Sequence, residues 1–175
     1  MTTAPSLAVQ KTTHSRISET DFNNLEFGKY ISDHMVLADW AKGEWSEPSI
    51  VPFGELKMTP AMLALHYGQA IFEGMKAFRM VDGSINIFRP QKHHERIIKS
   101  LDRMCMPEIP YDLFIQSLHA LIELDKNWVP RTDGSSLLGG FLADIAKRLQ
   151  GPQDRAALEL VLVRLADAGH FALRL

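Results

Sequence analysis

The spacing of apolar residues changes between residues 74 and 106, and the change predicts a β-hairpin followed by a helix. Gly74–Met80 and Ser84–Arg89 have the composition of strands, and residues 81–83 between them form a turn signal. Pro90 then stands where the first turn of a helix tolerates proline. We expect a helix from Pro90 to about Met106, with an apolar stripe formed by residues at helical spacing: Ile97, Leu101 and Met104.

Two further elements complete the predicted fold. Apolar residues keep an approximately helical period between residues 110 and 128, which predicts a second helix with Asp112 as its candidate amino-terminal cap. Trp40 and Trp45 flank a turn-rich stretch that is typical of another hairpin. Because hairpin connections join antiparallel strands, the predicted fold class is α+β, with a mainly antiparallel sheet and packed helices.

Three segments are expected to lie outside this pattern. The first sixteen residues are rich in Ser and Thr and contain no acid, so residues 1–26 are predicted to form a mobile amino-terminal arm. Residues 51–54 are expected to begin a connecting loop. The character of the sequence changes at Leu138, and the tail 138–175 is predicted to hold a short helix at 141–150 and a hairpin that includes a strand near 158–165.

Composition excludes several classes of function. With 46% hydrophobic and 23% charged residues the chain is ordinary globular material, and it holds no apolar run long enough for a membrane span. A net charge of -2 and a pI near 6.4 argue against nucleic acid as a partner. Cys105 is the single cysteine, which fits a reducing compartment and predicts a cytoplasmic protein. The adjacent His93 and His94 point apart on a helix, so we predict no metal site.

The residue pattern also suggests a place where an anion could bind. His93 and Arg96 are three residues apart and share a face of the predicted helix, next to its apolar stripe. Arg96 could therefore meet an anion held against the hairpin, although spacing alone is more typical of a solvated arginine. Tyr67 and Phe72, in the same region, are by themselves typical of core packing.

Several ordered motifs extend this interpretation to a family resemblance. Residues 27–137 resemble the amino-terminal domain of the branched-chain amino acid aminotransferases, which are fold type IV pyridoxal-phosphate enzymes of the class IV aminotransferase family. The long central motif 64–78 carries most of the similarity, and shorter motifs surround it: Phe27-Gly28, Ser32-Asp33-His34-Met35, Phe88-Arg89-Pro90, Arg96, and residues 124–130.

The resemblance implies specific roles. Arg96 matches the arginine that binds the phosphate of pyridoxal 5'-phosphate, and Tyr67 and Phe72 match residues that line the pocket for the aliphatic side chain of the substrate. The implied substrates are branched-chain amino acids and 2-oxo acids such as 2-oxoglutarate, and the implied assembly is a homodimer. The family places its Schiff-base lysine in a second domain, so Lys76 is not that lysine and no catalytic residue is assigned.

The sequence departs from the family after residue 137. The family continues there with tyrosine, an apolar residue, arginine and proline, and that arginine binds the substrate carboxylate. Here the chain reads Leu138-Gly139-Gly140-Phe141, and no arginine occurs between Arg131 and Arg148. We therefore expect a truncated or altered chain that retains the cofactor weakly and is inactive alone.

Two other functional classes stay open. The chain is alternatively a non-catalytic binding or dimerisation module of the same fold, or another fold type IV enzyme such as a D-amino acid aminotransferase or an aminodeoxychorismate lyase. The motif Ser32-Asp33-His34-Met35 favours the branched-chain group over those enzymes.

Overall fold

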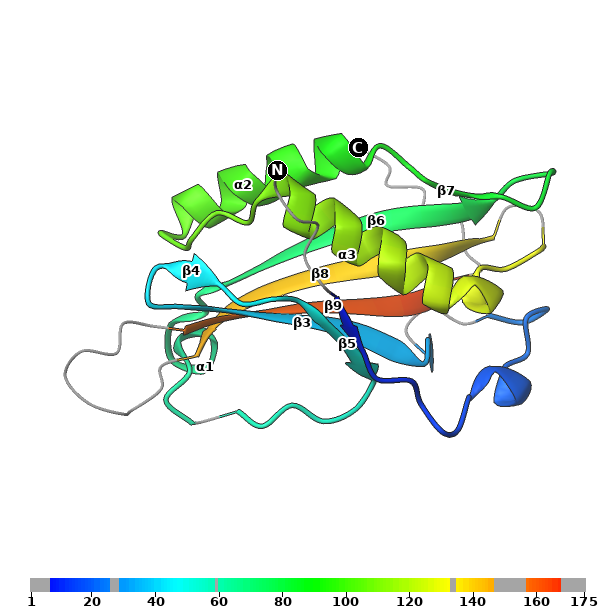
Figure 1. The fold of residues 1–175 in the computed structure, drawn as a ribbon, viewed down its shortest axis with the longest axis horizontal. Helices are drawn as coiled ribbons and strands as arrows, with labels where there is room; N and C mark the ends of the chain where they lie inside the picture. The colour runs from blue at the N-terminus through cyan, green and yellow to red at the C-terminus, as the bar shows by residue number, and fades with distance from the viewer. Residues whose placement is uncertain (1–6, 26–28, 59, 133–134, 147–156, 168–175) are drawn as a thin grey trace.

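The described strands join into one sheet with helices on one of its faces (Figure 1). The computed structural model describes residues 7–25, 29–58, 60–132, 135–146 and 157–167. Along the sheet the strands follow the order β1-β5-β3-β9-β8-β6-β7, with β2 beside β9 and β4 beside β3. Their bounds are β1 Ala8–Val9, β2 Tyr30–Ile31, β3 His34–Ala41, β4 Glu44–Trp45, β5 Ser49–Pro52, β6 Ala70–Arg79, β7 Ile85–Ile87, β8 Ser136–Ala146 and β9 Ala157–Asp167.

The pairing directions decide the fold class. Strand β1 runs parallel to β5, and the other described pairs are antiparallel. The predicted α+β fold with a mainly antiparallel sheet is therefore confirmed. The predicted hairpin around Trp40 and Trp45 is also confirmed, because these two residues face each other across β3 and β4.

The second predicted hairpin is formed by β6 and β7, and β6 begins earlier than predicted, at Ala70. Gly83 has a φ of +84°, which glycine adopts without the clash a Cβ would cause. Asp82 stabilises the turn, because its Oδ1 accepts hydrogen bonds from the backbone N–H and the hydroxyl of Ser84 at 2.9 and 2.6 Å.

Two long helices cover the sheet on the same face (Figure 1). Helix α2 spans Pro90–Arg103 and α3 spans Tyr111–Leu124, which confirms both predicted helices, although α2 ends before Met106. The predicted cap Asp112 is wrong, because α3 follows Pro110 and no side chain caps it. The short helices are α1 Leu63–Tyr67, η1 Ile17–Glu19 and η2 Lys126–Trp128.

The core lies between these helices and β6. Along β6, Ile71, Met75 and Ala77 alternate with more exposed residues and pack against Ile97 and Leu101 of α2. Successive residues of a strand point to opposite faces, so the alternation assigns one face of β6 to the core. Burying one large aliphatic side chain of this kind stabilises the fold by about 1.5–3 kcal/mol.

The described part of the amino-terminal arm contacts the domain. Ser15 donates a hydrogen bond to Asp33 at 2.6 Å, and the backbone N–H of Arg16 donates to the same carboxylate at 2.9 Å. The backbone N–H of Thr12 donates to Nε2 of His34 at 2.9 Å. These contacts place residues 12–16 against the start of β3. The predicted mobility of residues 1–26 stays a prediction.

The tail of the chain differs from its predicted structure. Residues 141–146 form strand β8, so the helix predicted for 141–150 is wrong over these residues, whereas β9 confirms the strand predicted near 158–165. Strand β8 pairs with β6 on one side and with β9 on the other, and this long-range pairing is what a local pattern does not contain. The sheet thus incorporates this tail at its centre.

A smaller correction concerns residues 51–54, which were expected to begin a loop, because Val51 and Pro52 end strand β5. Several predicted features lie outside the described residues, namely the Phe27-Gly28 motif, the end of the predicted helix at 147–150 and the last apolar stretch at 168–175. None of the described helices is long and apolar enough to cross a membrane.

Candidate functional site

The predicted cofactor residue Arg96 is anchored to β6 by a glutamate that sequence reasoning missed. Glu73 lies on the buried face of β6, under α2. Arg96 donates through Nε to Oε2 of Glu73 at 2.9 Å and through Nη2 to Oε1. His93 contacts Oε1 through Nδ1 at 3.0 Å, and because a carboxylate only accepts, Nδ1 is the donor. The predicted shared face of His93 and Arg96 is confirmed, and both side chains meet on Glu73.

Electrostatics favour the charged forms of this pair. Burial raises the pKa of Glu73, but hydrogen bonds from Arg96 and His93 outweigh burial, so the net pKa is lower than usual. The same pairing raises the pKa of Arg96 above its already high ordinary value. Glu73 is therefore a fixed anion that holds the guanidinium in one orientation, as bidentate geometry does.

A small cationic pocket of about 250 Å³ adjoins Arg96 on the solvent side of α2. Arg89, Lys92 and Lys99 line it together with Arg96, and Glu95 is its one acid, paired with Lys92 at 2.8 Å. The Nη1 atom of Arg96 donates to none of the described residues, and 65% of the side chain is exposed. The residues present therefore fit a phosphate group, which binds to arginine through several charge-assisted hydrogen bonds.

The structure does not bring Arg96 into one pocket with the predicted substrate residues. Phe72 precedes Glu73 on β6, so its side chain leaves the opposite face of the strand. Neither Tyr67 nor Phe72 lines the pocket of Arg96, so the expected common concavity is not formed by this chain. The edge of β6 beside Phe72 and Glu73 carries no described strand, because β6 pairs with β7 only at Ala77–Arg79.

Both predicted substrate residues are exposed rather than packed in the core. Tyr67 is 80% exposed and Phe72 is 71% exposed, so core packing does not explain them. Exposed large aromatic side chains of this kind typically mark surfaces that contact a ligand or another domain. Lys76 leaves β6 on the same face as Phe72, away from Glu73. Within the described part of the chain, no group of three His, Cys, Asp or Glu side chains could hold a metal ion.

Sequence comparison gives relatives of known activity. The chain is 40% identical over 126 residues to branched-chain-amino-acid aminotransferase 2 of Bacillus subtilis, an alignment that covers 71% of this chain and 35% of that enzyme. It is 43% identical over 123 residues to the branched-chain-amino-acid aminotransferase of Mycolicibacterium smegmatis, covering 70% and 33%. Over this length, the chain is a homologue of the branched-chain-amino-acid aminotransferases. It spans about a third of the length of these relatives.

Solved structures of aminotransferases share the fold. An Escherichia coli branched-chain amino acid aminotransferase aligns with 78% of this chain and 41% of its own, with a TM-score of 0.56 and 17% identity. A second branched-chain amino acid aminotransferase, from T.th. and solved with pyridoxamine 5'-phosphate, aligns with 87% of this chain and 44% of its own, with a TM-score of 0.53 and 21% identity. No protein-family model matches the chain. The predicted resemblance to fold type IV aminotransferases is thus confirmed.

Proposed function

We propose that this chain is the small domain of a branched-chain amino acid aminotransferase and that Arg96 binds the phosphate of pyridoxal 5'-phosphate in the complete enzyme. The observation that carries the proposal is the anchoring of Arg96 by Glu73 in a cationic pocket, within a chain about 40% identical to such enzymes. A guanidinium fixed before the ligand arrives loses less freedom on binding.

The remaining roles follow from the same homology. Tyr67 and Phe72 would line the pocket for the side chain of leucine, isoleucine or valine, and their exposure leaves both rings accessible to a second domain. The substrates would be these amino acids and 2-oxo acids such as 2-oxoglutarate, in a cytoplasmic homodimer. Bound pyridoxal phosphate would supply the electron sink for the amino transfer. The residues of this chain would bind and orient it.

A second candidate, a non-catalytic binding module of the same fold, is favoured by one observation. No arginine stands between Arg131 and Arg148, where the family resemblance implies an arginine for the substrate carboxylate. For either candidate we expect the purified 175-residue chain to form no glutamate from leucine and 2-oxoglutarate. Leucine-dependent glutamate production by the chain alone would contradict this expectation.

A graft distinguishes the two candidates. In the Bacillus subtilis relative, the segment that aligns with residues 27–137 is replaced by those residues of this chain. We expect the chimera to retain pyridoxal phosphate absorbance and to transaminate leucine, and we expect Arg96→Gln to lose both properties. Arg103→Gln is the matched control, because Arg103 lies in the last turn of the same helix. A chimera that unfolds cooperatively but binds the cofactor equally well with Arg96→Gln would refute the role of Arg96.

A further inference from the structure

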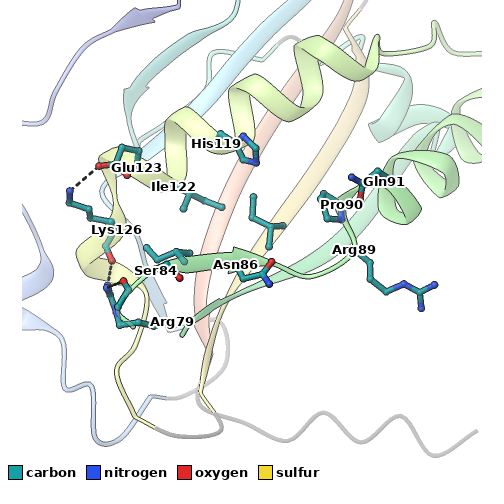
Figure 2. A pocket seen from close by; sticks show the side chains of 13 residues that line it. Arg79, Ser84, Asn86, Arg89, Pro90, Gln91, His119, Ile122, Glu123 and Lys126 are labelled. Atoms are coloured by element: carbon teal, nitrogen blue, oxygen red, sulfur yellow. Dashed lines mark hydrogen bonds and ion pairs between the residues drawn. The ribbon is translucent and has the colours of Figure 1, made fainter. Parts of the chain in front are cut away.

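A second and larger cavity lies away from the pocket of Arg96. This groove has a volume of about 780 Å³ and runs between strand β7 and helix α3 (Figure 2). Ile85 and Ile87 border it from β7, whereas His119 and Ile122 extend toward it from α3 (Figure 2). Its length follows β7 because nearly every residue from Gly83 to Gln91 lines it. The groove is therefore a slot beside a strand.

The strand that borders the groove is the edge of the sheet. Among the described residues β7 pairs with β6 alone. Met80 donates its backbone N–H to Ser84, and Phe88 donates to Lys76, so residues 84, 86 and 88 direct their backbone groups toward β6. The alternation of an antiparallel pair then directs the N–H and C=O groups of Ile85 and Ile87 outward. An extended peptide could pair with these four groups.

The charges around the groove indicate the chemistry of such a peptide. Lys126 and Arg79 lie at one end of β7 and Arg89 lies at the other, whereas Glu123 is the one acid among the lining residues. The guanidinium of Arg79 donates to the carbonyl oxygens of Gly83, Lys126 and Val129, so no carboxylate neutralises it. Arg89 forms no ion pair with a described residue and extends away from α3 (Figure 2). Both ends are therefore positive, in a chain with a net charge of -2.

We propose that this groove binds an extended peptide segment of another protein as an added β-strand, with apolar residues facing Ile85 and Ile87 and acidic residues at both ends. The distance from residue 84 to residue 89 along an extended chain is roughly 17 Å, so about six residues of peptide span it. Backbone pairing provides affinity in this mode, and the end charges provide direction and selectivity. The proposal uses no residue of the Arg96–Glu73 pair and is independent of the proposed function.

Charge also decides against a second copy of this chain as the occupant. Antiparallel pairing of β7 with β7 of another copy would centre on Asn86 and bring the positive ends of both grooves together. Like charges opposed at an interface disfavour the complex. An acidic peptide neutralises the same positions.

The test uses the full chain and a fluorescein-labelled peptide, acetyl-Asp-Glu-Val-Thr-Val-Glu-Asp-amide, in a fluorescence anisotropy titration. A peptide with lysine at the four acidic positions is the charge control. In the protein, Ile85→Pro removes an outward N–H without removing a bond to β6, and Ile85→Val is the matched control that keeps the N–H. Circular dichroism checks that both variants melt cooperatively.

We expect the acidic peptide to bind the unaltered chain and the Ile85→Val variant, and to bind about tenfold more weakly to Ile85→Pro. The lysine peptide should bind at least about tenfold more weakly than the acidic one. The proposal is overturned if the acidic peptide does not bind, if both peptides bind equally, or if a folded Ile85→Pro variant binds as the unaltered chain does. Self-association that Ile85→Pro abolishes, measured by analytical ultracentrifugation, would identify a second copy as the occupant and would also overturn it.

Discussion

Glu73 and Arg96 form an ion pair whose two members differ in burial. The side chain of Glu73 is 8% exposed, whereas that of Arg96 is 65% exposed. A buried group that loses its partner keeps its desolvation penalty, but an exposed group regains water. The two members should therefore respond differently to removal of the other.

We expect Arg96→Gln to destabilise the chain more than Glu73→Gln does. Loss of Arg96 leaves a buried carboxylate with His93 as its remaining side-chain partner, and should cost roughly 1–3 kcal/mol. Loss of the Glu73 charge leaves Arg96 solvated and should cost about 1 kcal/mol or less. Urea unfolding at neutral pH measures both values. A larger loss for Glu73→Gln than for Arg96→Gln would show that the carboxylate is not the vulnerable partner.

Two buried carboxylates should make the chain sensitive to acid. Burial raises the pKa of Asp33, but hydrogen bonds from Ser15, Arg16 and Trp128 outweigh it, and the net pKa lies below the ordinary 3.8. The pKa of Glu73 likewise lies below 4.5. A lowered folded pKa means that each group stabilises the fold above its unfolded pKa and loses that contribution as pH falls through its folded pKa.

The free energy of unfolding should therefore fall between about pH 5 and pH 3, and the fall should be shallower in the double variant Asp33→Asn, Glu73→Gln. Urea titrations at a series of pH values measure this slope. An equal slope in both proteins would mean that other groups control acid stability.

Part of the site could be predicted from sequence at this scale, and part could not. Helical spacing was enough to put His93 and Arg96 on one face of α2. Glu73 was missed, although Ile71, Met75 and Ala77 on either side of it alternate as a buried face, and a carboxylate in such a row is a signal for a buried partner. The opposite faces of Arg96 and Phe72 follow from the same alternation. Family similarity does not encode this geometry directly.

Among the elements, the amino-terminal arm depends on one carboxylate. Asp33 accepts from Ser15 and Arg16 of the arm, and also from Nε1 of Trp128 at 3.1 Å. We expect Asp33→Ala to release the arm and to speed trypsin cleavage after Arg16 several-fold. Asp39→Ala is the matched control, because Asp39 lies in the same strand and its carboxylate has no hydrogen bond to a described residue. Equal cleavage rates would show that Asp33 does not hold the arm.

The strand β8 shows where local patterns fail at the scale of elements. Gly139 and Gly140 contribute no side chain that would reveal a buried face, and the residues after them suit a helical period as well as a strand. Its conformation is set by pairing with β6 and β9, which lie far away in sequence. By contrast, the β6–β7 hairpin and α2 were predictable because turn chemistry and proline position are local signals.

For the whole molecule, the central place of β8 and β9 has a consequence for folding. These two strands lie between β3 and β6, so without them the sheet separates into two parts. A chain ended after Leu137 should therefore lose cooperative unfolding and expose the edges of β3 and β6. Thermal unfolding followed by circular dichroism tests this expectation. A truncated chain with the same midpoint would mean that residues 27–137 fold independently.

The central claim is that this chain carries the phosphate end of a pyridoxal phosphate site at Arg96. The most direct measurement compares the binding of pyridoxal 5'-phosphate and of pyridoxal, which lacks the phosphate, to the 175-residue chain by equilibrium dialysis. We predict about tenfold tighter binding of the phosphorylated compound, loss of that preference in Arg96→Gln, and its retention in Arg103→Gln. Equal binding of the two compounds, or a preference that survives Arg96→Gln in a folded chain, would contradict the account.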